Sequence, residues 1–448
     1  MTMTLQLRRT LLAVNVVFVA LSAGVANAQE NEAKEAIEES AQEATDGEGE
    51  PGAAGTAATA SGYAETVSVA GGDKSVTAEL VSADADVVPL LDIDVSLRFT
   101  DWLKERKHRF NSRTGIAFSV DYTFLAQQAS SSLAEKDAAS DVFRIFGNWM
   151  AFGDILGTNG SLVFKYEHRA AIWGRQTPRD LGFATGSALS TANYKENGWG
   201  WTDFYWKHIL YGGKVAIIGG HMDPGDWADQ HSLLNAWTNL LNDAFYNNPS
   251  EAIPKRTFSV VTRVNLGGSW YGGFGIHDAN GKDNHIDFKQ VWDTPELFTW
   301  VEIGRHTDES ANFGETTHLH YWHQDQRVEA GVEESWGLAA SRSQVHDNGY
   351  TTVFRLGYSE GDAAQMRRFV GAAVSRNVRV SDNILVGIGW GSPPDKSLGN
   401  QTVLEAMYHL QLTNSVVVSP DLQVTFNPSF DQTTSVVYVF GFRFRLVF

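Results

Sequence analysis

The sequence predicts an all-β chain, a transmembrane antiparallel β-barrel of about 16 strands preceded by a disordered acidic N-terminal segment. The clearest sign is residues 436–448, where every second residue is apolar while Arg443 and Arg445 share the other face. This alternation indicates a strand whose faces meet different surroundings, here lipid outside and water inside. Two observations agree: the alternation recurs from Gly115 onward, and 42 glycines with 12% aromatic residues suit barrel strands and aromatic girdles.

The chain begins with the features of a secretory signal peptide. Arg8 and Arg9 precede an apolar run at 11–25, and Ala26-Asn27-Ala28 offers small residues for cleavage, so residues 1–28 are predicted to be removed. A signal anchor is the less favoured alternative, since the run is short for a membrane span. No other apolar run has the length of a membrane helix, which argues against a helical membrane protein. Because there are no cysteines, disulfides and cysteine metal sites are excluded.

Residues 29–95 are predicted to be an acidic low-complexity periplasmic linker. They contain sixteen acidic and two basic residues, and few large apolar ones, so they can bury little surface. A short helix around 32–44 and binding to cell-wall material are alternatives to a solvated spacer. Most of the net charge of −18 lies in this segment, and nothing resembles the basic footprint of a nucleic-acid binder.

The barrel domain is expected to span residues 96–448. It opens with a basic amphipathic stretch at 100–110, which predicts a short helix against the periplasmic mouth, capped by Thr100 or Asp101. The alternative is a polar lead-in.

Sixteen stretches follow the period-two pattern, an even number as bacterial barrels require. They are 115–126, 141–150, 160–172, 199–209, 213–222, 256–266, 269–278, 296–306, 316–324, 333–343, 350–358, 368–375, 383–391, 401–411, 416–427 and 434–448. The pattern is weakest at 141–150 and 296–324. Tight turns such as 210–213 suit the periplasmic side, and the long connections at 173–198 and 223–255 suit external loops. A barrel of this size encloses an aqueous channel.

Charged and amide side chains on the predicted inner face are the candidates for contact with a solute. They are Lys165, Glu167, Arg169, Arg263, Arg355, Glu405, Gln423, Arg443 and Arg445. Such groups can replace the water around hydroxyls, and the rigid donor fork of Arg can grip vicinal hydroxyls. The alternative is that most only make the lumen polar, with opposite charges paired to hold the wall rigid.

The loop at 221–245 is the best candidate for a constriction that folds into the barrel. It combines Asp223, Asp226 and Trp227 with further amides and Trp237. An ordinary surface loop is the alternative. His318 and His320 lie on one strand face, as in some metal sites, but structural or lumen-lining histidines are favoured. No metal and no cofactor are expected.

The last hundred residues contain several short motifs. They read VFRLGY at 353–358, TVLEAMY at 402–408, SPDLQ at 419–423, Asn427-Pro428 and GFRFRL at 441–446. In these motifs the chain resembles the OprB-type carbohydrate-selective porins of Gram-negative outer membranes, closely over 350–448 and loosely over 100–448. The resemblance implies a sixteen-stranded barrel whose external loops narrow the pore, with charged residues at the constriction that admit neutral sugars. Residues 140–345 follow the family pattern only faintly.

The predicted function is therefore facilitated diffusion of small carbohydrates across the outer membrane of a Gram-negative bacterium. A general, non-selective diffusion porin is the alternative. A barrel enzyme and a structural envelope protein are less favoured, since no hydrolase motif such as G-x-S-x-G occurs. The expected partners are small carbohydrate solutes and outer-membrane lipid, with no nucleic acid, and a homotrimer is left open.

Overall fold

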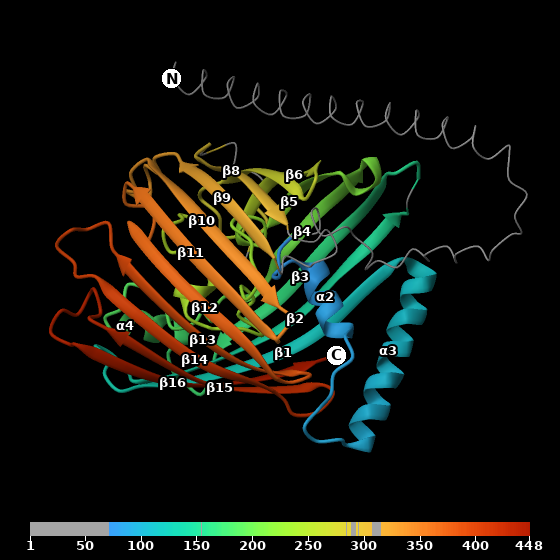
Figure 1. Ribbon diagram of the computed structural model, residues 1–448, viewed down its shortest axis with the longest axis horizontal. Helices are drawn as coiled ribbons and strands as arrows, with labels where there is room; N and C mark the ends of the chain where they lie inside the picture. Colours follow the sequence, from blue (N-terminus) through green and yellow to red (C-terminus); the bar gives the residue numbers. More distant parts are fainter. Residues whose placement is uncertain (1–70, 154, 284, 288–292, 294, 307–314) are drawn as a thin grey trace, which may run out of the picture.

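The computed structural model describes residues 71–448 except 154, 284, 288–292, 294 and 307–314. The predicted signal peptide and the short helix around 32–44 lie outside these residues. The described residues form a closed barrel of sixteen antiparallel strands, each paired with its sequence neighbour, and β16 closes the barrel against β1 (Figure 1). The predicted fold class is confirmed.

Each predicted stretch corresponds to one strand. The strands are β1 (Ile116–Ala129), β2 (Asp137–Phe152), β3 (Asn159–Ala171), β4 (Gly198–Leu210), β5 (Val215–Met222), β6 (Thr257–Gly267), β7 (Trp270–Asp278), β8 (Leu297–His306), β9 (Thr316–Gln324), β10 (Ser335–His346), β11 (Tyr350–Glu360), β12 (Arg368–Arg379), β13 (Asp382–Ser392), β14 (Gln401–Gln411), β15 (Val416–Phe426) and β16 (Val436–Val447). The largest difference is at β2, which extends beyond the predicted 141–150 at both ends.

Burial alternates along the strands as the sequence pattern predicts. On β16, Phe440 is 59% exposed on the outer face, whereas Arg443 and Arg445 are buried on the inner face. An outer face of this kind suits lipid, and the inner face encloses the polar groups. The barrel wall therefore separates an apolar exterior from a charged lumen.

The two ends of the barrel differ in the length of their connections. At one end the strands join through short turns, such as Gly267 and Gly268 between β6 and β7, where positive φ angles of 85° and 56° favour glycine. At the other end lie the long loops, which carry the short helices α4 (Pro178–Ala184), η3 (Pro224–Asp226) and α5 (Asp243–Tyr246). In outer-membrane barrels the short turns are periplasmic and the long loops extracellular.

Helix α3 (Asp94–Thr114) lies outside the barrel at the short-turn end, close to the C-terminus (Figure 1). Phe99 packs edge-on against Phe448. The helix is longer than the predicted 100–110, and the expected cap is wrong: Ile93 holds the N-cap position, while the Thr100 hydroxyl donates to the Ser96 carbonyl within the helix. None of the helices in the described residues is both long and apolar enough to cross a membrane.

Helix α2 (Val76–Asp84) lies inside the barrel against β1, β2 and β3. Residues 71–80, most of which are buried, thus differ from the solvated spacer expected over 29–95. The physical reason is that α2 buries Val76 and Leu80 in an apolar cluster with lumen residues such as Trp227, and its one buried acid, Glu79, meets cations of the wall. The other boundaries of that segment stay predictions.

Candidate functional site

In the part of the chain that the structure describes, the segments inside the barrel include α2 and the connection between β5 and β6 at residues 223–256, here called the inward loop. Most residues of the inward loop are buried, among them Trp227 and Leu241 with no exposed surface. A surface loop would instead show its side chains to solvent. The inward loop therefore folds into the barrel, and its role as a constriction stays a prediction.

All nine side chains predicted to line the lumen lie on the inner face and are buried. They are Lys165, Glu167, Arg169, Arg263, Arg355, Glu405, Gln423, Arg443 and Arg445. They do not form one cluster. The structure divides them into three groups according to what they contact.

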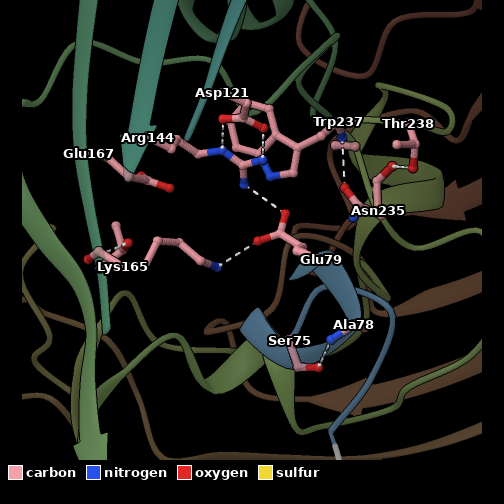
Figure 2. A network of polar contacts seen from close by, with 12 residues as sticks. Ser75, Ala78, Glu79, Asp121, Arg144, Lys165, Glu167, Asn235, Trp237 and Thr238 are labelled. Atoms are coloured by element: carbon pink, nitrogen blue, oxygen red, sulfur yellow. Dashed lines mark hydrogen bonds and ion pairs between the residues drawn. The ribbon is translucent and has the colours of Figure 1, made fainter. Parts of the chain in front are cut away.

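The first group lies on β1–β4 and is centred on Arg144, a residue that the sequence analysis missed (Figure 2). The Arg144 guanidinium forms an ion pair with Asp121 and donates to Glu79 of α2 at 2.7 Å. Arg445 of β16 donates to the same Asp121 at 2.7 and 3.0 Å. The inner face of β2 gave a weak signal because Val142 and Phe146 also point inward, into apolar clusters.

Lys165 extends this group toward the inward loop. Its ammonium lies 3.1 Å from Asp203 of β4, 3.3 Å from Glu79 and 3.7 Å from Asp226 of the loop. Four ionisable groups, from β3, β4, α2 and the inward loop, therefore meet at this level of the lumen. Oppositely charged groups at such distances hold one another in place where water is largely excluded.

Glu167 and Arg169 form a neighbouring pair on β3. The Arg169 Nε donates to Glu167 at 2.8 Å, and Arg256, the last residue of the inward loop, lies 3.3 Å from the same carboxylate. Arg169 also donates to the Asn193 carbonyl in the loop before β4. Two loops therefore meet at this pair.

The second group lies on β6–β11 and holds the start of the inward loop. Arg263 forms an ion pair with Glu302 at 2.9 Å and also donates to the Trp227 carbonyl. Arg355 pairs with Asp229 of the inward loop. Burial is the largest single influence and raises the pKa of Asp229, but Arg355 and His318 together with His231 outweigh it and hold the pKa well below its usual range.

His318 and His320 belong to this second group. The Nε2 of His318 lies 2.6 Å from Asp229, and the Nδ1 of His320 lies 3.3 Å from Glu302. Each imidazole thus has a carboxylate partner in the lumen. Among the described residues, no group of three or more metal-ligating side chains is arranged to hold a metal ion.

The third group lies on β14–β16 and holds the middle of the inward loop through its backbone. Glu405 accepts from the Leu241 N–H at 2.6 Å and the Asn242 N–H at 3.0 Å. Arg443 donates to the Ala236 and Asn239 carbonyls at 2.6 and 2.9 Å. Gln423 donates to the carbonyl of Thr191, which lies in the connection between β3 and β4.

The three inward-loop residues named from the sequence have different surroundings. Trp227 is buried edge-on to Tyr205, with ring centroids 5.9 Å apart, so its ring faces protein. Asp226 lies near Lys165, but burial is the larger influence and raises its pKa well above the usual range. Asp223 is half-buried and lies 4.0 Å from Arg256. Only Asp223 borders the cavity described next.

A cavity of about 340 Å³ lies among the long loops on the outer side of the inward loop. Its lining is mainly polar and includes Lys195, Asp283 and Arg256, and the Lys195 ammonium lies 2.5 Å from Asp283. Burial, helped by the Arg256 charge, lowers the pKa of Lys195 to about 7. A second cavity of about 200 Å³ lies at the short-turn end, lined by residues of α2, α3 and β16, and the two share no lining residue.

The arrangement suits reversible contact with a polar, uncharged solute. Ammonium, guanidinium, carboxylate and amide groups follow one another around a narrowed lumen, so a solute with several hydroxyls can exchange water for protein donors and acceptors stepwise. Since most charges are already paired, no single site holds the solute strongly, which is what passage requires.

Comparison with known proteins agrees with this geometry. Residues 305–448 match the family model described as "Carbohydrate-selective porin, OprB family". The high-pH structure of Pseudomonas putida OprB matches with a TM-score of 0.59 at 13% identity, over 78% of this chain and 97% of that one.

Weaker structural matches include the low-pH form of P. putida OprB and a triple mutant of Rhodopseudomonas blastica porin. The first has a TM-score of 0.46 at 14% identity, over 78% of this chain and 97% of that one. The second has a TM-score of 0.46 at 11% identity, over 74% and 100%. No match is found among the curated proteins. The 0.59 match confirms the barrel fold, and the family match over residues 305–448 confirms the resemblance seen in the C-terminal strands.

Proposed function

We propose that this chain is an outer-membrane porin that passes small carbohydrates by facilitated diffusion through a lumen narrowed by the inward loop. The proposal involves no covalent step and no enzyme activity. The observation that supports it best is the inward loop itself, held across the lumen by charged side chains of three parts of the wall. A wide, indifferent pore would have no need of such anchoring.

The carbohydrate preference is supported by the family match over residues 305–448 and by the polar cavity above the inward loop. That cavity offers charged and amide groups on several sides, which can hydrogen-bond hydroxyls in many orientations. A neutral sugar leaves the charge pairs of the lumen intact, whereas a charged solute would have to compete with them.

Liposome swelling with the refolded protein tests this function. We expect monosaccharides to enter clearly faster than disaccharides, and faster than uncharged polyols of similar size, because the narrowed lumen selects by size and by hydrogen bonding. Entry at rates set by size alone would favour the alternative, a general diffusion porin. No swelling with any solute would contradict the channel proposal.

Small carbohydrates are thus the proposed solutes, and outer-membrane lipid is proposed to cover the apolar exterior. A homotrimer is the assembly to test, by the mass of the protein in detergent after subtraction of bound detergent.

A further inference from the structure

Helix α2 lies where a solute would have to pass, although it belongs to none of the barrel's loops. We propose that α2, packed against the inward loop, forms part of the constriction, and that Glu79 sets the ion selectivity of the pore. This inference rests on the proposed channel function and adds a second narrowing element to it.

The helix is bound to the lumen by apolar packing. Val76 and Leu80 are almost fully buried, in the same cluster as Phe146 of β2, Tyr205 of β4 and Trp227 of the inward loop. Burial of apolar side chains of this size stabilises the docked position of the helix. A helix with two such anchors is part of the wall of the pathway.

Glu79 is the residue through which α2 changes the net charge of the lumen. Its two carboxylate oxygens lie 2.7 Å from Arg144 and 3.3 Å from Lys165, and both cations belong to the barrel wall (Figure 2). Asp121 and Asp203 are the wall's own partners for these cations. Removing the Glu79 charge would therefore leave this level of the lumen more positive by one unit.

The segment just before α2 is joined to the inward loop. Lys74 donates to Asn247 at 3.1 Å, and Asp73 accepts from the Leu233 N–H at 3.2 Å. Gly72 lies so close to the loop that a Cβ there would come within 1.6 Å of the Gln230 side chain. The two narrowing elements are therefore packed side by side and support each other.

The segment that follows α2 fastens it to the short-turn end of the barrel. The Val88 N–H donates to the Ser381 hydroxyl at 2.8 Å, and the Leu90 and Leu91 N–H groups donate to the Gln411 and Leu412 carbonyls. Beyond these contacts the chain continues into α3, outside the barrel. Since α2 is held at both ends, it is a fixed element of the constriction.

The first test compares Glu79→Gln with a matched charge removal, Asp94→Asn, on the exposed start of α3. In planar bilayers with a salt gradient, Glu79→Gln should raise the anion-to-cation permeability ratio on the order of threefold, as expected for one unit charge several ångströms from the ion path in a water-like medium. Asp94→Asn should match the wild type, since its charge lies outside the lumen and is screened by salt. Equal permeability ratios for all three proteins would overturn the proposal.

The second test uses the absence of natural cysteines. Ala78 of α2 is half-buried, and Val95 of α3 is 78% exposed. In Ala78→Cys, a negatively charged methanethiosulfonate reagent should reduce single-channel conductance in one step, whereas the same reagent on Val95→Cys should leave it unchanged. If conductance does not change in Ala78→Cys under conditions that fully label Val95→Cys, α2 does not line the pathway.

These results separate the failure of the inference from the failure of the channel function. A wild type that conducts and is blocked by sugars, with Glu79→Gln and labelled Ala78→Cys indistinguishable from it, contradicts only the role of α2. A folded wild-type barrel that conducts no ions contradicts both. Circular dichroism of each refolded variant shows that the barrel has formed.

Discussion

The inner wall has two regions that have similar sequence patterns but differ in what their charged side chains contact. On β1–β4, charged side chains meet other charged side chains, as Arg144 meets Asp121. On β14–β16, they meet the backbone of the inward loop, as Glu405 and Arg443 do. We call the first the charge-paired wall and the second the loop-anchoring wall. Inward-facing charges thus have two uses: one sets the field in the pore, and the other sets its shape.

The largest effect is expected from breaking the charge-paired wall. Arg144→Met leaves Asp121 with Arg445 alone and Glu79 with Lys165 alone, so two buried carboxylates lose a partner. Loss of one member of a buried ion pair costs about 3–5 kcal/mol. We expect the free energy of unfolding in urea to fall by that amount and the pore to become more cation-selective. A variant with unchanged stability and selectivity would contradict the distinction between the walls.

A smaller loss of stability, with a different functional result, is expected from the loop-anchoring wall. Arg443→Met keeps the length of the side chain but removes the donors to the Ala236 and Asn239 carbonyls. Hydrogen bonds to a charged group contribute about 1.5–3 kcal/mol. The freed loop should increase the noise of the open-channel current more than Arg144→Met does.

The matched control for Arg443→Met is Arg368→Met, on an exposed position at the start of β12. It removes the same charge from the outside of the barrel, so current noise and stability should stay close to those of the wild type. Equal noise in both variants would show that Arg443 does not hold the loop.

The smallest effect concerns pH and the cavity above the loop. Lys195, with its pKa lowered to about 7, faces Asp283, Arg256 and Arg169, and burial raises the pKa of Glu251 to about 8. As pH rises from 6 to 9, Lys195 loses a positive charge and Glu251 gains a negative one. Both changes make the cavity more negative and so favour the passage of cations over anions. Reversal potentials should shift toward cation selectivity over this range, and Lys195→Met should remove the part of the shift centred near pH 7.

The strands could be predicted from the sequence because alternation is a local property. All sixteen stretches were found, and the inward position of each charged residue followed from its place in the pattern. The connection at 221–245 was named as the candidate constriction from its mixture of acids, amides and tryptophans, with an ordinary surface loop as the alternative. The local pattern does not identify the partner of a charged side chain. Arg355 and Arg445 occupy equivalent positions in the alternating pattern, yet Arg355 pairs with the inward loop and Arg445 pairs with Asp121.

Helix α2 was missed for the same reason. The acidic, low-complexity residues before it are typical of a solvated linker, and the whole of 29–95 was interpreted with them although α2 itself carries Val76, Leu80 and Val81. The cations that pair with the Glu79 carboxylate lie on β2 and β3, and Arg144, which donates to it, is 65 residues farther along the chain. Only the closed barrel brings them together, so the buried position of α2 depends on tertiary structure.

The most direct test of a carbohydrate-selective pore is the single-channel current of the refolded protein in a planar bilayer, titrated with a neutral monosaccharide. We predict that the sugar reduces the current saturably, because the narrowed lumen holds it for a measurable time, while a polyol of similar size at equal concentration does not. A large current that is indifferent to every sugar would contradict the selective pore and leave a general porin.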